Sequence, residues 1–157
     1  MTFELNLFSV DDISPATCQA PLQLTATTGA ILLSRLVTAN CGTSSRPLTL
    51  HAQPGQRLNI SLYDFSASGA AGQQSRCSDV YGDVTDLSSA DTTVAAALCS
   101  GSERKRQVLS SSGHAVRITL SQDRLGSLNA ILIYDGRCIQ ETHGRSTKRH
   151  CYIHVRS

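Results

Sequence analysis

Six cysteines are the residues of this chain with the most chemistry to offer: Cys18, Cys41, Cys77, Cys99, Cys138 and Cys151. Their number is even, their spacings are wide, and no two of them form a CxxC pair. Zinc sites usually draw two ligands from one short knuckle, so disulfides are favoured over a metal site and over free buried thiols. Six cysteines allow fifteen pairings. Pairing neighbours along the chain would close three separate loops, each able to stabilise the fold by about 3 kcal/mol.

Five histidines raise the question of metal binding or catalysis. His51 and His114 lie in or beside predicted strands and are interpreted as surface or turn residues. The other three gather in the tail: His143, His150 and His154. They could join a zinc site only if Cys138 and Cys151 kept free thiolates. The chain has no GxSxG, HExxH or glycine-rich phosphate loop, so we expect no catalytic residue, no enzyme and no cofactor.

Asn59 begins an N-glycosylation sequon, Asn-Ile-Ser, inside the stretch RLNISLYDF. In that stretch Leu58, Ile60 and Leu62 alternate with polar residues, which predicts a strand. Asn59 then falls on the polar face, where a sugar would not collide with the core. Disulfides and a sequon together indicate an oxidising, glycosylating compartment, and we expect an extracellular protein.

Two basic clusters are predicted to lie in loops. They are Arg104-Lys105-Arg106 and the set Arg145, Lys148 and Arg149. On an extracellular protein such clusters are either ordinary solvated turns or candidate contacts for a heparin-like polysaccharide or an acidic protein. The net charge is only +2, which argues against nucleic acid as a partner.

The composition favours one domain of short strands. The 157 residues are rich in Ser, Thr, Gly and aliphatic side chains and contain no Trp. No run approaches the roughly 18 apolar residues of a membrane helix. The opening MTFELNLFSVDD lacks the basic and apolar regions of a signal peptide, so we expect that peptide to be absent from this fragment.

Strand-like stretches recur between turn signals along the whole chain. They cover 2–7, 29–34, 47–52, 57–65, 114–121, 127–136 and 151–155. The stretch 91–99 fits a strand or a short helix, 66–76 has the composition of a loop, and 101–107 has that of a charged turn. Many short strands without a clear amphipathic helix predict an all-β fold, a disulfide-stapled antiparallel β-sandwich of the jelly-roll type.

Four stretches in order resemble a CUB domain, an extracellular β-sandwich module. They are HAQPGQRLNISLYDF, the span CSDVYGDVTDLSS with its flanking cysteines, LSSSGHAVRITLSQD and GSLNAILIYDG. The front half departs from the family, since it lacks the usual tyrosine and Cys-x-Trp. The resemblance implies a Cys77–Cys99 disulfide and, with less support, Cys18–Cys41; Cys138–Cys151 would then close a terminal hairpin.

The resemblance also raises a calcium site, which many CUB domains build from three carboxylates. The candidates in this chain are Asp79 or Asp83 after the third cysteine, and Asp123 in the late turn. Ser68 occupies the position of the usual glutamate, so the set is incomplete and calcium is not the favoured expectation.

The expected organisation has three parts: an added N-terminal strand in 1–17, a CUB-like sandwich in 18–138 and a disulfide-closed hairpin in 139–157. We expect a non-catalytic recognition or adhesion module of a secreted protein or receptor ectodomain. Its partner would be another extracellular protein, with self-association through a sheet edge or binding of a heparin-like glycan as alternatives. No direct membrane insertion of this fragment is expected.

Overall fold

The computed structural model describes residues 22–25, 28–67, 77, 79–88, 90, 94–121, 129–143 and 146–150. The expected strands at 2–7 and 151–155, and with them the 1–17 extension, lie outside this part of the chain.

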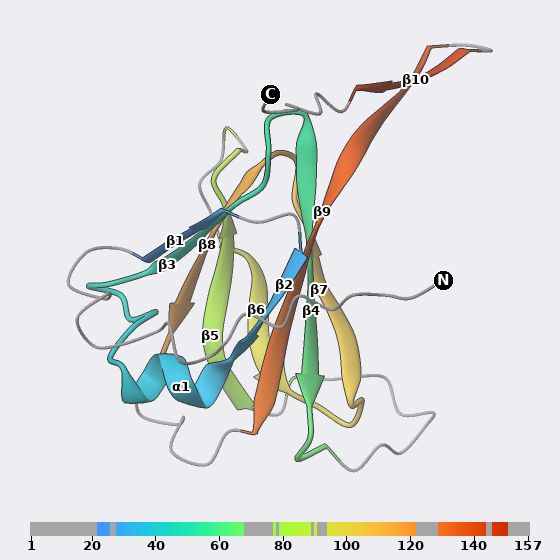
Figure 1. The fold of residues 1–157 in the computed structure, drawn as a ribbon. Helices are drawn as coiled ribbons and strands as arrows, with labels where there is room; N and C mark the ends of the chain where they lie inside the picture. Colours follow the sequence, from blue (N-terminus) through green and yellow to red (C-terminus); the bar gives the residue numbers. More distant parts are fainter. Residues whose placement is uncertain are drawn as a thin grey trace.

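Two sheets face each other as the layers of a sandwich (Figure 1). The first sheet has the order β1 (Leu22–Thr25), β3 (Leu48–His51), β8 (Ala115–Leu120), β5 (Asp79–Asp86) and β6 (Val94–Ser100). The second contains β2 (Thr28–Leu32), β9 (Ala130–His143), β4 (Gln56–Asp64) and β7 (Lys105–Ser110), side by side in that order, and β10 (Ser146–His150) beside the far part of β9. Every described pairing is antiparallel except β1 with β3. The predicted all-β sandwich is confirmed.

Alternation of apolar and polar residues positions these strands. In β4 every even-numbered residue is buried and every odd-numbered residue is half-buried. Leu58, Ile60 and Leu62 therefore point inward, where they join Leu132 and Tyr134 of β9 in the core. Burying one such aliphatic side chain stabilises the folded state by about 1.5–3 kcal/mol, so this face fixes the register of β4 against its neighbours.

The structure differs from the strand predicted for the stretch 29–34. The expected strand ends at Leu32, and a six-residue helix, α1 (Leu33–Thr38), begins there. Leu33 and Leu36 are fully buried, so the helix uses the same apolar residues to close one end of the sandwich. A short apolar run fits either element, and tertiary burial decides between them. The ambiguous stretch 91–99 forms β6 from Val94 onward.

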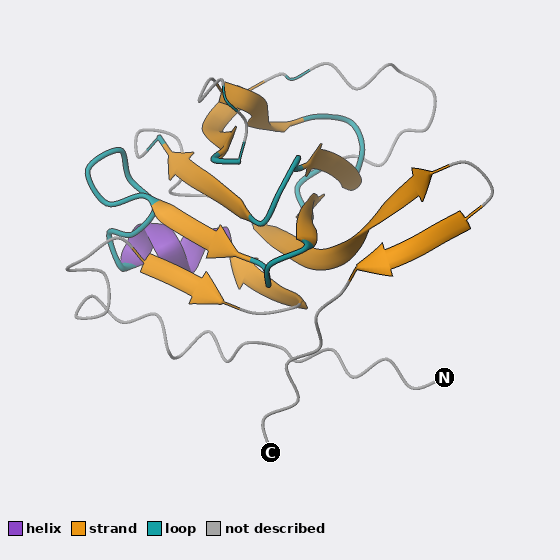
Figure 2. Ribbon diagram, turned by 90° about the horizontal axis from the view of Figure 1, so that it is seen from above, coloured by secondary structure: helices purple, strands orange, loops and turns teal. Residues whose placement is uncertain are grey.

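Strand β9 is the longest element and continues beyond the sandwich. Its first half is central, between β2 and β4, whereas residues 139–143 pair, among the described strands, only with β10. This second half and β10 form a hairpin that projects from the two layers (Figures 1 and 2). We call this hairpin, formed by 138–143 and 146–150, the β9–β10 ribbon.

One disulfide joins Cys77 to Cys99, the pair expected from the sequence. Cys41 and Cys138 are also disulfide-bonded. Their expected partners, Cys18 and Cys151, lie outside the described residues, so those pairings stay predictions.

Candidate recognition face

The outer face of the sheet β2-β9-β4-β7 gathers the most varied set of accessible side chains in the described part of the chain. Because successive strand residues point to opposite sides, the register assigns one outward residue per strand to each row across the sheet. Four such rows follow one another along β4, at positions 63, 61, 59 and 57. We call this surface the outer face.

Two of the rows carry apolar side chains. The first places Leu32, Ile131 and Tyr63 side by side, and the second places Ala30 next to Ile133, followed by the polar Ser61 and Gln107. The five apolar side chains are half-buried rather than enclosed in the core. The ammonium group of Lys105 lies 5.3 Å from the centre of the Tyr63 ring and closes the first row at β7. Partly accessible apolar side chains grouped on an outer sheet face are typical of an interaction site.

The third row is polar and internally hydrogen-bonded. Thr28 donates from its hydroxyl to the Asp135 carboxylate at 3.1 Å, and Ser110 donates to the Asn59 side-chain oxygen at 2.7 Å. The register places all four residues in one line across the sheet. These bonds fix the orientation of the polar groups that border the apolar rows.

The fourth row consists of two arginines directly opposite each other, Arg57 on β4 and Arg137 on β9. Arg137 donates from Nε to Asp135 Oδ2 at 2.9 Å, in an ion pair whose side chains are 68% and 36% exposed. Arg57 is half-buried and has no hydrogen bond or ion pair within the described residues. Like charges directly across a strand pair repel each other, so this row is not explained by the stability of the sheet.

The sequon residue Asn59 lies on this outer face, as predicted. Strand β4 is central, since it pairs with β9 on one side and β7 on the other, so Asn59 is not at a sheet edge. Its side-chain oxygen accepts the bond from Ser110, while the sugar-accepting atom of a sequon is the amide nitrogen. Glycosylation of Asn59 remains a prediction.

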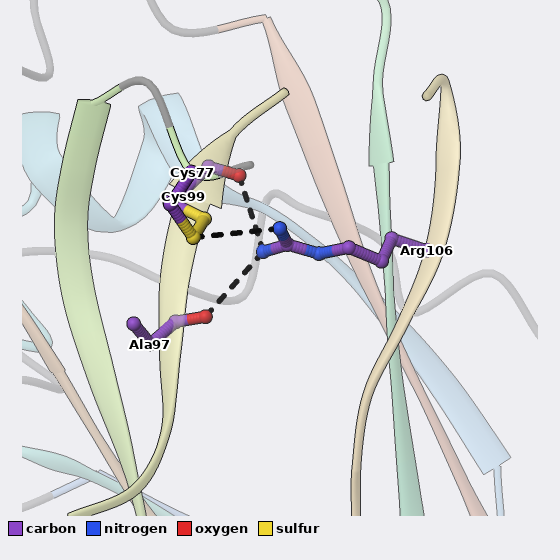
Figure 3. The surroundings of a disulfide bond; sticks show 4 residues. All are labelled: Cys77, Ala97, Cys99 and Arg106. Carbon is purple, nitrogen blue, oxygen red and sulfur yellow. Dashed lines mark hydrogen bonds between the residues drawn. A yellow bond between two sulfur atoms is a disulfide. The ribbon is translucent and has the colours of Figure 1, made fainter. Parts of the chain in front are cut away.

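The first basic cluster lies in a loop only in part: Arg104 is in the bend before β7, but for Lys105 and Arg106 this expectation was wrong. Lys105 and Arg106 belong to β7. Arg104 donates from Nε to the Ala67 carbonyl at 3.4 Å. The Arg106 side chain extends from β7 toward β6. Its Nη2 donates to the carbonyls of Ala97 and Cys99 on β6, at 3.4 and 3.3 Å (Figure 3). Because β7 and β6 belong to different sheets, Arg106 links the two layers.

The second basic cluster was also expected in a loop. The structure places Lys148 and Arg149 in β10, opposite Glu141 and Gln140 of β9. Arg145 lies outside the described residues. Pairing with β9 puts Lys148 on the same face of the ribbon as Arg137, and Arg149 on the other face. No local pattern reveals this arrangement, because it depends on the register of the two strands.

The calcium candidates are not brought together by the described residues. Asp79 is exposed at the start of β5, and Asp83 is half-buried further along it, opposite Thr119. Asp123 lies outside the described residues. Within those residues no group of three or more His, Cys, Asp or Glu side chains could hold a metal ion.

The histidines can be placed only in part. His51 lies in β3, where its Nε2 is buried without a hydrogen-bond partner in the part of the protein described. His114 is exposed in the turn before β8, and its carbonyl accepts the Ala52 N–H. In the register of the β9–β10 ribbon His143 lies opposite Ser146 and His150 opposite Ile139, and His154 lies outside the described residues.

Sequence reasoning missed a buried polar cluster at the end of β4. Asp64 is 3% exposed, and its Oδ1 accepts the Ser66 N–H at 2.8 Å. Burial raises the pKa of the Tyr81 hydroxyl well above its usual range; the nearby Asp64 carboxylate raises this pKa further, and Arg106 lowers it. The Tyr81 hydroxyl has no hydrogen-bond partner in the part of the chain described. Arg106 therefore lies in a structural environment and not on a free basic surface.

The serine-rich turn before β8 has a structural role. Ser111 is 1% exposed; its Oγ accepts the Leu58 N–H at 2.7 Å and donates to the Gly113 carbonyl at 2.6 Å. Asp86, at the end of β5, accepts the N–H groups of Ser88 and Ser112 at 3.0 and 2.6 Å. These hydrogen bonds join the two sheets at one end, so the serines of the sequence LSSSG have a structural explanation.

A shallow cleft of about 400 Å³ lies at the other end of β8. It is lined mainly by hydroxyl groups and one amide: Asn40, Thr43, Ser44, Ser45, Leu120 and Ser121. Asn40 and Gly42 have φ values of 57° and 73°, so the turn beside the cleft is in the left-handed region. Thr43 is engaged locally, through its hydroxyl, with Ser45 and the Arg46 N–H.

Comparison with known proteins does not add a family to this description. No protein-family model matches the sequence, and no curated protein is significantly similar to it. Among the described residues no helix is both long and apolar enough to span a membrane.

Proposed function

We propose that this protein is a non-catalytic extracellular recognition module, and that its outer face binds another extracellular protein. The observation that carries the proposal is the pair of apolar rows on the outer face, Leu32–Ile131–Tyr63 and Ala30–Ile133. These side chains remain partly accessible although their strands are central or next to central. Covering them with a partner would remove apolar surface from water, which contributes about 25 cal/mol per Å².

The rest of the outer face suits protein recognition. Specific protein interfaces combine an apolar centre with a polar rim that carries directed hydrogen-bonding groups. Here the apolar rows are bordered by the hydrogen-bonded row of Asp135 and Asn59, and Tyr63 supplies the kind of aromatic side chain that is enriched at interface hot spots. The backbone beneath is held by ladders on both sides of β4 and β9, so little ordering is needed on binding.

The extracellular location and the CUB-like identity belong to the same proposal. They are supported by the all-β sandwich, by the Cys77–Cys99 disulfide and by a sequon on an outward face. Mass analysis of the non-reduced protein from a secreting eukaryotic host tests them. We expect three disulfides and hexose on Asn59; six free thiols or bound zinc would overturn this location.

The binding function is tested with the labelled, tetramerised protein on a panel of cultured animal cells. Ile133→Asp places a charge in the centre of the second apolar row, and Thr85→Asp makes the same kind of change on a half-buried residue of the opposite sheet. We expect saturable binding to a subset of cells by the wild type and by Thr85→Asp, and a loss of at least tenfold for Ile133→Asp. Equal binding by both variants, or no saturable binding to any cell, would overturn the proposal. Unfolding midpoints show that both variants are folded.

A further inference from the structure

We infer that a basic track, which starts on the outer face at Arg57 and Arg137 and continues along the β9–β10 ribbon to the position of Lys148, binds an extended sulfated polysaccharide. The inference deepens the proposed function, because it names a second ligand class for an extracellular module and rests on that location. Of the two basic clusters predicted from the sequence, the track takes only Lys148.

The first step is the Arg57–Arg137 pair. Residues directly opposite in an antiparallel pair have Cβ atoms roughly 4.5–5.5 Å apart, so two cationic side chains share a small area. Asp135 holds Arg137 through Nε, which leaves the terminal guanidinium nitrogens of Arg137 without a hydrogen bond to any described residue. Arg57 has no partner at all within the same residues. A sulfate group that accepts from both arginines would relieve their repulsion.

The second step is the direction in which the positive charge continues. The strand β9 runs from Arg137 into the ribbon, where β10 pairs with it in an unbroken register. Lys148 lies opposite Glu141, four residues beyond Arg137, which corresponds to about 13 Å along the strand. Arg149, opposite Gln140, falls on the other side of the ribbon, so the track holds three cations, Arg57, Arg137 and Lys148, against the two carboxylates of Asp135 and Glu141.

The third step is the shape of the ligand. The track follows a projecting two-stranded ribbon and not a concave pocket (Figure 2). Such a surface suits a linear polyanion, whose sulfate groups repeat along its length, better than a single small anion. The first basic cluster supplied the other candidate contacts, but Arg104 and Arg106 donate to carbonyls of Ala67, Ala97 and Cys99, and Lys105 lies over the Tyr63 ring.

The test uses heparin chromatography and calorimetry with size-defined heparin oligosaccharides on the full chain. Arg57→Gln is the principal variant, because it removes a charge without breaking an observed bond; Lys148→Gln tests the ribbon. Arg117→Gln is the matched control, since Arg117 is an exposed strand arginine on the opposite sheet. Inorganic sulfate alone serves as the probe for a site that takes only a single anion.

We expect Arg57→Gln and the ribbon variant each to weaken heparin binding at least fivefold and to elute at lower salt than Arg117→Gln. Affinity should rise with oligosaccharide length and fall steeply with salt, while inorganic sulfate should compete weakly. The inference fails if the wild type does not bind heparin, if Arg117→Gln loses as much as Arg57→Gln, or if inorganic sulfate competes as well as an oligosaccharide. The apolar Ile133→Asp variant should keep heparin binding, so failure of this site and failure of the protein-binding proposal are distinguishable.

Discussion

Replacing Arg106 with glutamine tests whether the first basic cluster is structural. Arg106 donates to two β6 carbonyls at 3.3 and 3.4 Å and lies near the buried Tyr81 hydroxyl. A hydrogen bond to a charged group contributes about 1.5–3 kcal/mol, and bonds of this length belong at the lower end. Since two carbonyls lose their donor, we expect the free energy of unfolding to fall by about 2–4 kcal/mol.

The assay is equilibrium unfolding in guanidinium chloride with the disulfides intact. The midpoint should fall while the m-value stays constant, because the change removes contacts and not compactness. Lys105→Gln is the matched control: Lys105 is the adjacent residue, exposed on the same strand, and its contact with Tyr63 contributes only about 0.5–1 kcal/mol. Arg106→Lys should be intermediate, since one ammonium group cannot reproduce the guanidinium fork. If Arg106→Gln were no less stable than Lys105→Gln, the link between the two sheets would have no energetic role.

Three further changes test the packing and the buried polar groups. Gly29→Ala would push a Cβ into the Tyr134 ring on the neighbouring strand β9, so we expect the free energy of unfolding to fall by about 1–3 kcal/mol. The decrease should be smaller when Tyr134→Leu is already present. Ser111→Ala removes two hydrogen bonds to the backbone and should lower the free energy of unfolding by about 1–3 kcal/mol. Ser112 is exposed, so Ser112→Ala should lower it by less than about 0.5 kcal/mol. Similar values for the two variants would refute the structural role of the turn. Tyr81 keeps its proton in the folded state above its ordinary pKa, so above about pH 10 the unfolded state binds fewer protons and stability falls by up to about 1.4 kcal/mol per pH unit for this residue. Tyr81→Phe should flatten that decline between pH 9 and 11.5, and parallel pH curves for variant and wild type would contradict the assignment.

The sequence predicts the central strands well because their burial follows a local pattern. The alternation at 57–65 and 114–121 corresponds to β4 and β8, and the apolar stretch at 127–136 corresponds to the central part of β9. In each case one face is buried in the core, so a shift of one residue would expose every apolar side chain. The Cys77–Cys99 pair followed from a resemblance and not from spacing.

The elements that the sequence predicts poorly depend on the environment of the folded chain. The stretch around Lys105 and Arg106 looks like a charged turn because β7 is flanked by only one strand of its sheet and can carry charged residues. Its inward arginine is accommodated by carbonyls of the other sheet. The apolar stretch after Gly29 divides into a strand and a helix because Leu33 and Leu36 complete the core at its end.

The candidate site was the least predictable part, for a reason of register. Alternation shows that Asn59 and Arg57 point outward, but it does not say what lies beside them. Arg137 becomes the neighbour of Arg57 only through the pairing of β4 with β9, and Lys148 joins them only through the pairing of β10. Long-range strand pairing of this kind leaves no signal in a single sequence.

The position of the outer face on central strands matters for how it could bind. Binding residues are usually expected on loops, which a rigid scaffold presents and which must often be ordered by the ligand. Here Tyr63, Ile131 and Ile133 stand on β4 and β9, which are hydrogen-bonded on both sides, and Asp135 is held by Thr28 and Arg137. Because these groups are already fixed in the free protein, binding a partner of complementary shape would cost little conformational entropy. On the proposed function, the same rigidity would keep the face from adapting to a poorly matched partner, so its selectivity would follow from the arrangement of its four rows.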